Sequence, residues 1–121
     1  MTGWTKTVLS EGNGVDKPSQ GDKVFINYTG WLRDPSNSGD YEKGTEFDSS
    51  RSRGPLQVKI GVGQVIKGWD EGVLSMTLGE KAILTIDSSY GYGARGFPGV
   101  IPPNSDLVFE VELIRINDKS A

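Results

Sequence analysis

The sequence predicts an α+β fold in which a curved antiparallel β-sheet packs against one short helix. Several segments alternate apolar and polar residues with a period of two, which is typical of strands that have one face in water. One segment has the helical period instead. Glycine accounts for 17 of the 121 residues, a share that indicates a backbone with many tight turns. A chain of this length corresponds to one domain, which we expect to span residues 1–121.

Four segments have the alternation that predicts strands. Residues 24–31 are rich in β-branched and aromatic residues and place Val24, Ile26 and Tyr28 on one face. The other three segments are residues 56–60, 81–86 and 109–113. Because mostly polar residues occupy the opposite face of each segment, we expect antiparallel strands with one wet face.

The predicted helix lies within residues 66–76. Its apolar positions are spaced by three, four and three residues, and they are Ile66, Trp69, Val73 and Met76. Gly68 and Gly72 each cost about 1 kcal/mol relative to alanine inside a helix. We therefore expect this helix to be short and to depend on packing against the sheet.

Two long segments have no regular pattern. Residues 33–45 are polar and rich in turn-forming residues, which predicts a loop or a bulged insertion. Residues 88–105 combine four glycines and three prolines with aromatic and aliphatic side chains. The second segment is too apolar for a disordered loop, so we expect it to form one wall of a binding site.

The composition excludes several classes of function. The net charge is −3, and the 13 basic residues are interspersed with 16 acidic ones, which argues against nucleic acid as a partner. The sequence has no apolar run of membrane-spanning length and no pattern of a secretory signal, so we expect no membrane contact and a cytoplasmic protein. The absence of histidine and cysteine removes imidazole and thiolate catalysis and nearly all zinc sites. We expect neither a metal nor a cofactor.

Two motif matches have simpler interpretations as loops. Residues 91–96 match the dinucleotide fingerprint GxGxxG letter for letter, but Phe97-Pro98-Gly99 follows and stops the helix that this motif requires. Residues 34–45 faintly resemble a calcium-binding loop, but Thr45 stands where a bidentate glutamate belongs.

Six strings of residues occur in an order that resembles a known protein family. They are YTG (28–30), FDSSR (47–51), VIKGWDEG (65–72), YGYG (90–93), PGVIPPN (98–104) and LVFEVEL (107–113). Together they resemble the FKBP family of peptidyl-prolyl isomerases, over about residues 8–116. The resemblance implies a five- to six-stranded curved antiparallel sheet wrapped around one short amphipathic helix, with a pocket between the helix and the sheet.

The resemblance also assigns pocket residues by motif position. Trp69 is expected to form the floor of the pocket, and Asp48 is expected at its edge. The wall residues implied in this way are Tyr28, Phe47, Val65, Ile66, Tyr92, Ile101 and Phe109, and the further ligand-binding positions are Leu56 and Phe97. The backbone N–H of Ile66 and the hydroxyl of Tyr92 are expected to donate hydrogen bonds to a bound carbonyl. The expected catalytic residues are Asp48, Tyr92 and Phe47.

The chain departs from the family pattern at three places. Leu56 and Val58 stand where many members have phenylalanine, and Phe97 replaces a histidine found in relatives. Residues 33–45 form a longer loop than the compact pattern. These departures bear on ligand and partner preference. Phe97-Pro98 is also an apolar Xaa-Pro pair, which raises the hypothesis that it occupies the pocket of a neighbouring molecule.

The resemblance implies cis–trans isomerisation of Xaa-Pro bonds in peptides and proteins. It also implies binding of the macrolides tacrolimus and rapamycin in the same pocket, and macrolide-dependent partners such as calcineurin or the TOR kinase. We expect a monomer. An alternative function is a binding module whose turnover is incidental, whereas a purely structural role leaves the apolar 88–105 loop unexplained.

Overall fold

The computed structural model describes residues 3–51 and 53–121. The strands are β1 (Trp4–Ser10), β2 (Lys23–Arg33), β3 (Lys43–Ser49), β4 (Leu56–Lys59), β5 (Lys81–Ile86), β6 (Leu107–Ile116) and β7 (Lys119–Ser120). The α-helix is α1 (Lys67–Leu74), and short 3-10 helices lie at Ser38–Asp40 and Ser88–Tyr90.

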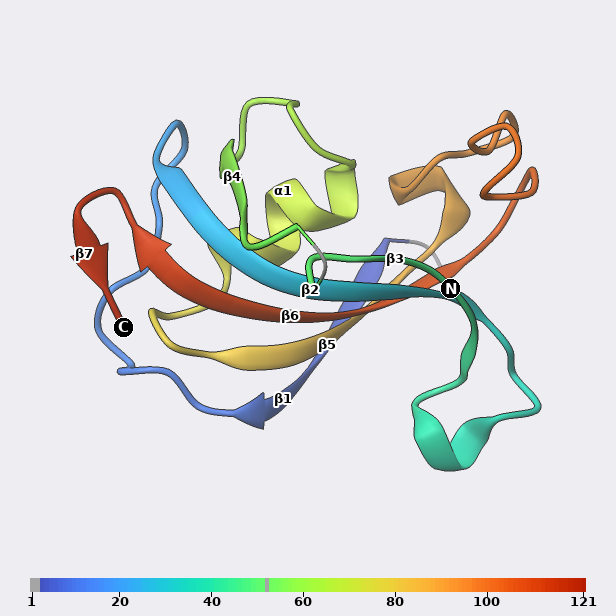
Figure 1. Cartoon of the computed structure of the whole chain (residues 1–121), viewed down its shortest axis with the longest axis horizontal. Helices are drawn as coiled ribbons and strands as arrows, with labels where there is room; N and C mark the ends of the chain where they lie inside the picture. The colour runs from blue at the N-terminus through green and yellow to red at the C-terminus, as the bar shows by residue number, and fades with distance from the viewer. Residues whose placement is uncertain (1–2, 52) are drawn as a thin grey trace.

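The strands form one antiparallel sheet. Its main path has the order β1-β5-β6-β2-β3, while β4 pairs with β2 and β7 pairs with β6. Figure 1 shows the long strands β2 and β6 curving side by side, with α1 on the concave side of the sheet. The core fills the space between them. This arrangement confirms the predicted α+β fold, a curved antiparallel sheet around one short helix.

The alternation predicted for the central strands is observed. Phe109, Val111 and Leu113 of β6 are buried, while Glu110 and Glu112 are partly exposed. On β5, the residue predicted for the wet face at position 83 is buried as well. This strand lies between β1 and β6 in the sheet, so Ile83 has a paired residue on each side, Thr7 of β1 and Glu110 of β6.

Three strands, β1, β3 and β7, lie outside the segments that the alternation predicts. Residues 43–45, predicted as part of a loop, instead begin β3, and β2 continues to Arg33. The β2–β3 pairing has two register shifts, so the strands do not keep a strict period of two. β1 is a mostly exposed edge strand. Lys6 attaches it to the core, because its ammonium lies 3.0 Å from the Glu80 carboxylate and 3.0 Å from the carbonyl oxygen of Ser75.

The helix is shorter than the predicted apolar stripe. Ile66 is the residue before α1, and its carbonyl accepts hydrogen bonds from the N–H groups of Trp69 and Asp70 at 2.9 and 3.1 Å. Met76 lies just after the helix and is fully buried. All four residues of the stripe nevertheless contact the core. In the described part of the chain, no helix is long and apolar enough to cross a membrane.

Gly68 and Gly72 bring the helix close to the sheet. A Cβ atom at Gly68 would lie 2.7 Å from two carbons of Ile86, and one at Gly72 would lie 3.0 Å from the methyl groups of Leu84. Carbon atoms normally pack about 3.5–4.0 Å apart. The helix therefore packs directly on β5 only because these two positions lack side chains.

The 88–105 segment is an ordered loop without a long regular element. Phe97 and Ile101 exchange two backbone hydrogen bonds of 2.8 Å and close a tight turn at the tip of the loop. The N–H of Asn104 donates to the carbonyl of Gly93 at 2.9 Å and holds the base. Gly96 has a φ of +66°, and a Cβ there would lie 2.3 Å from the Ile101 carbonyl oxygen, so this turn requires glycine.

Candidate active-site pocket

A pocket of about 370 Å³ opens between α1, the concave face of the sheet and the 88–105 loop. The residues that line it come from β2, β3, β4, β6, α1 and two loops. They are Tyr28, Phe47, Asp48, Leu56, Gln64, Val65, Ile66, Trp69, Tyr92 and Phe109. The fold thus gathers nine of the eleven residues that the sequence predicts for the site.

The inner part of the pocket is a cluster of aromatic rings in edge-to-face contact. The Trp69 ring lies 5.0 Å from the Tyr28 ring and 5.2 Å from the Phe109 ring, measured between centroids. The Phe47 ring lies 5.6 Å from that of Phe109. Gly30 of β2 makes this packing possible, because a Cβ there would lie 2.7 Å from both phenylalanine rings. Such contacts hold each ring in one orientation, so the wall is preformed.

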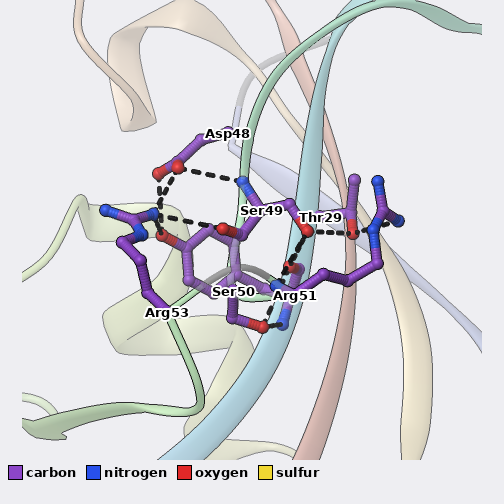
Figure 2. A network of polar contacts seen from close by, with 7 residues as sticks. Thr29, Asp48, Ser49, Ser50, Arg51 and Arg53 are labelled. Atoms are coloured by element: carbon purple, nitrogen blue, oxygen red, sulfur yellow. Dashed lines mark hydrogen bonds and ion pairs between the residues drawn. The ribbon is translucent and has the colours of Figure 1, made fainter.

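Polar groups meet at one edge of the pocket. The Tyr28 hydroxyl donates to Asp48 Oδ2 at 2.7 Å, and the Arg53 guanidinium donates to the Tyr28 oxygen at 2.9 Å and to the other Asp48 oxygen. Figure 2 shows Asp48 and Arg53 facing each other within this network. The N–H of Ser49 also donates to Asp48, at 2.9 Å. The carboxylate therefore sits in a fixed position with its charge partly balanced by Arg53.

Two tyrosine hydroxyls at the pocket stay protonated well beyond neutral pH. Burial raises the pKa of Tyr28 to about 12, with further contributions from the hydrogen bond to Asp48 and its charge. Burial also raises the pKa of Tyr92, and the charge of Asp48 adds to the effect. Both phenols are hydrogen-bond donors rather than bases at physiological pH.

The pocket also presents donors that the described residues leave free. The backbone N–H of Ile66 and the hydroxyl of Tyr92 form no hydrogen bond within the described part of the chain. The indole N–H of Trp69 is buried and has no partner among the same residues. Unpaired donors beside an apolar cavity suit a ligand with carbonyl oxygens, because each buried donor gains a partner when the ligand binds.

A second hollow, of about 300 Å³, lies on the outer face of the sheet and differs in chemistry. Charged and hydroxyl side chains of β2, β5 and β6 line most of it. Most of its charges are already paired, since Glu110 lies 3.6 Å from both Lys81 and Lys43, and Arg51 lies 2.8 Å from Glu46. The apolar pocket is therefore the better candidate for a ligand site.

The family of the chain follows from comparison with known proteins. Residues 14–114 match the family model described as FKBP-type peptidyl-prolyl cis-trans isomerase. The chain belongs to this family. It is 61% identical over 116 residues to "FK506-binding protein 1B" of Aspergillus fumigatus, which covers 96% of each chain. It is 57% identical over 120 residues to "Peptidyl-prolyl cis-trans isomerase" of Schizosaccharomyces pombe, which covers 98% of this chain and 99% of the relative.

This FKBP-type protein is a peptidyl-prolyl cis-trans isomerase. Rotation about a peptide bond is opposed by about 18–20 kcal/mol of amide resonance, and proline leaves this exchange slow. No covalent bond is made or broken, so neither a nucleophile nor a proton-transfer group is needed. The absence of histidine and cysteine is compatible with such a reaction.

Two of the predicted residues do not line the pocket of this isomerase within the described chain. Ile101 is 5% exposed and packs in the core. Phe97 is 52% exposed at the tip of the 88–105 loop, where its ring contacts that of Tyr92 at 5.9 Å. It borders the entrance rather than the interior.

Two residues that the structure adds to the site have weak signals in the sequence. Gln64 lines the pocket, and its side-chain oxygen accepts a hydrogen bond from the N–H of Lys59 at 3.0 Å. Arg53 holds Tyr28 and Asp48. Its position just after the FDSSR string is the one feature of the sequence that indicates a role for it.

Proposed function

We propose that this isomerase binds and rotates Xaa-Pro bonds in the aromatic pocket between α1 and the sheet. The observation that carries the proposal is the convergence of nine predicted side chains on one preformed apolar cavity. The proline ring lies on Trp69 in this proposal, with the rings of Tyr28, Phe47 and Phe109 around it. Leu56 and Val65 complete the apolar wall.

The pocket lowers the barrier by favouring the twisted amide over the planar one. A planar amide is strongly dipolar and loses part of its dipole on twisting, so a dry apolar wall destabilises the planar ground state. The N–H of Ile66 and the hydroxyl of Tyr92 donate to substrate carbonyl groups and hold the chain on either side of the rotating bond. Each tenfold gain in rate needs about 1.4 kcal/mol of preference for the twisted form.

Asp48 contributes as a fixed charge at the edge of the pocket. Tyr28 and Arg53 hold its carboxylate in place. In this proposal the carboxylate faces the region where the amide dipole changes. Phe47 precedes Asp48 in β3, and its ring packs edge-to-face with that of Phe109. The catalytic contributions of Asp48, Tyr92 and Phe47 are thus electrostatic and steric, without proton transfer.

The same pocket binds macrolides such as tacrolimus and rapamycin in our proposal. Relatives named FK506-binding proteins, at 61% identity, support this assignment. The loaded protein then offers a composite surface to a second protein, such as calcineurin or the TOR kinase. The remaining parts of the proposal are one domain spanning residues 1–121, a monomeric state and a cytoplasmic location.

Exchange spectroscopy by NMR tests the proposed site. A Leu-Pro peptide is mixed with substoichiometric protein, and the cis–trans exchange rate is measured before and after adding one equivalent of tacrolimus. We expect acceleration by the free protein, loss of acceleration on adding the macrolide, and amide shift changes at Val65, Ile66, Trp69 and Tyr92 with either ligand. Acceleration that persists with the macrolide bound, or shifts confined to another surface, would refute the assignment of both ligands to this pocket.

A further inference from the structure

The charged residues of the chain are distributed unevenly around the pocket. Two segments border it, residues 49–68 and residues 88–105. They contain five of the 13 basic residues of the chain and none of its 16 acidic residues. These two segments therefore carry only positive charge, although the net charge of the chain is −3, and Asp48, the acidic residue that lines the pocket, is paired with Arg53.

Three of these five cations have no carboxylate partner within the described residues. Arg51 pairs with Glu46 at 2.8 Å, and Arg53 pairs with Asp48. Lys59, Lys67 and Arg95 are exposed and form no ion pair with a described carboxylate. We call Lys59, Lys67 and Arg95 the basic rim.

Each member of the basic rim is adjacent to a residue at the pocket. The N–H of Lys59 donates to the side chain of Gln64, which lines the cavity. Lys67 directly follows Ile66, and its ammonium lies 4.6 Å from the centre of the Tyr90 ring. Arg95 stands in the loop between Tyr92 and Phe97. The three cations therefore lie in segments next to the pocket, namely the end of β4, the start of α1 and the 88–105 loop.

The acidic groups nearest to the rim are engaged elsewhere. Asp70 accepts the N–H groups of Gly61 and Gly63 at 2.9 and 2.8 Å, and Glu71 accepts the indole N–H of Trp4 at 2.9 Å. Asp106, which ends the 88–105 loop, accepts the N–H of Ser88 at 2.9 Å and pairs with Arg33 at 3.2 Å. These carboxylates keep their negative charge, but none of them forms an ion pair with the rim within the described residues.

We infer that this isomerase prefers polypeptide segments in which aspartate or glutamate residues flank the Xaa-Pro bond. The inference rests on the proposed function of the pocket and names its substrate class. The apolar cavity receives the proline, while carboxylates two or three residues away reach the basic rim on either side. Charges at this range mainly raise the rate of productive association, and salt weakens them because the Debye length is about 10 Å at 0.1 M.

Three blocked peptides test this inference. Each has a central Leu-Pro pair with two glutamates, two glutamines or two lysines on both sides, and kcat/KM is obtained from NMR exchange rates at about 20 mM and about 500 mM NaCl. We expect the glutamate peptide to exceed the glutamine peptide by about 3- to 10-fold at low salt, with the lysine peptide lowest. At high salt the three values should converge to within about twofold.

Charge-matched variants locate the effect. Lys59→Gln, Lys67→Gln and Arg95→Gln are combined in one protein, and Lys17→Gln, Lys23→Gln and Lys119→Gln are combined in the control. The control residues cluster near β7, around hollows that Asp118 also lines. The rim variant should lose most of the ratio between the glutamate and glutamine peptides, while the control should keep it. If the rim variant does not fold, the salt dependence of the ratio between the glutamate and glutamine peptides, measured on the unmodified protein, is the test of the inference.

The outcomes separate this inference from the proposed function. Equal acceleration of all three peptides at low salt would overturn the inference while leaving the pocket assignment intact. An equal loss of preference in both triple variants would overturn it as well, because net charge rather than the rim would then be responsible. Acceleration of none of the peptides would instead refute the proposed function.

Discussion

Replacing Gly68 with alanine should push the first turn of α1 away from the sheet. The new Cβ would lie 2.7 Å from the Cδ1 and Cγ2 atoms of Ile86 and 2.8 Å from its Cγ1 atom. These separations are about 1 Å below a normal carbon contact. Ile86 is fully buried in β5, so it has little room to yield.

Two opposing effects set the magnitude. Overpacking of this kind costs about 1–3 kcal/mol, whereas alanine gains about 1 kcal/mol over glycine inside a helix. We therefore expect Gly68→Ala to lower the free energy of unfolding by about 1 kcal/mol, or Tm by about 3–6 °C. Because Trp69 follows directly, the floor of the pocket moves with the helix, and kcat/KM on a Leu-Pro peptide should fall about tenfold.

Gly72→Ala is the matched control. Its Cβ would lie 3.0 Å from two methyl carbons of Leu84, so a shift of a few tenths of an ångström relieves the contact. The helix-propensity gain is the same. Urea denaturation should therefore show Gly72→Ala to be more stable than Gly68→Ala by about 1 kcal/mol.

A double-mutant cycle with Ile86→Ala tests the cause directly. Ile86→Ala alone should cost about 2–5 kcal/mol by leaving a cavity, which the Cβ of Gly68→Ala then partly fills. The two changes should show a favourable coupling of about 1–3 kcal/mol. Additive free energies, or a Gly68→Ala protein more stable than the unmodified one, would refute the proposed contact as the cause.

Four further predictions concern the polar edge of the pocket. Tyr28→Phe should destabilise the protein by about 1 kcal/mol in urea denaturation, because the hydroxyl forms hydrogen bonds with Asp48 and Arg53. As the control, Tyr41→Phe at an exposed position should change stability by less than about 0.5 kcal/mol. Asp48→Ala and Tyr92→Phe should each weaken tacrolimus binding in calorimetry and lower kcat/KM about 3- to 30-fold while leaving measurable turnover. Complete loss of turnover in a folded variant of either kind would contradict a mechanism without proton transfer. The catalysed cis–trans exchange rate should not change with pH from about pH 6 to 9, because a raised pKa keeps Tyr28 and Tyr92 protonated to a higher pH than free tyrosine. A titration step in the rate within that range would contradict this prediction. The same raised pKa of Tyr28 implies stability that is present below about pH 10 and is lost as the pH rises toward 12.

The elements that the sequence predicts are those whose periodicity comes from burial. Val24 and Ile26 on β2 and the three alternate residues of β6 face the core, so the pattern and the structure have the same cause. β1 has no such pattern, because most of its residues remain exposed at the edge of the sheet. Its position depends on pairing with β5 and on the ion pair between Lys6 and Glu80.

The candidate site divides in a similar way. Aromatic residues within the strings that resemble the family are visible in the sequence, but the role of Arg53 depends on a turn that brings it back to Asp48 and Tyr28. Ile101 and Phe97 lie close together in the chain, yet one packs in the core and the other lies at the surface. The backbone hydrogen bonds of their tight turn decide between these positions, and composition does not reveal them.

The amino-acid sequence by itself determines the fold class, the short glycine-containing helix, the apolar loop and the chemistry available without histidine or cysteine. These properties depend on residue type and spacing along the chain. Only the tertiary structure decides which side chains share the cavity, how closely α1 approaches β5, and which charges remain unpaired around the opening. Those properties depend on contacts between segments far apart in the sequence. In a close-packed interior, a shift of about 1 Å between two such segments is enough to disrupt their packing around the pocket.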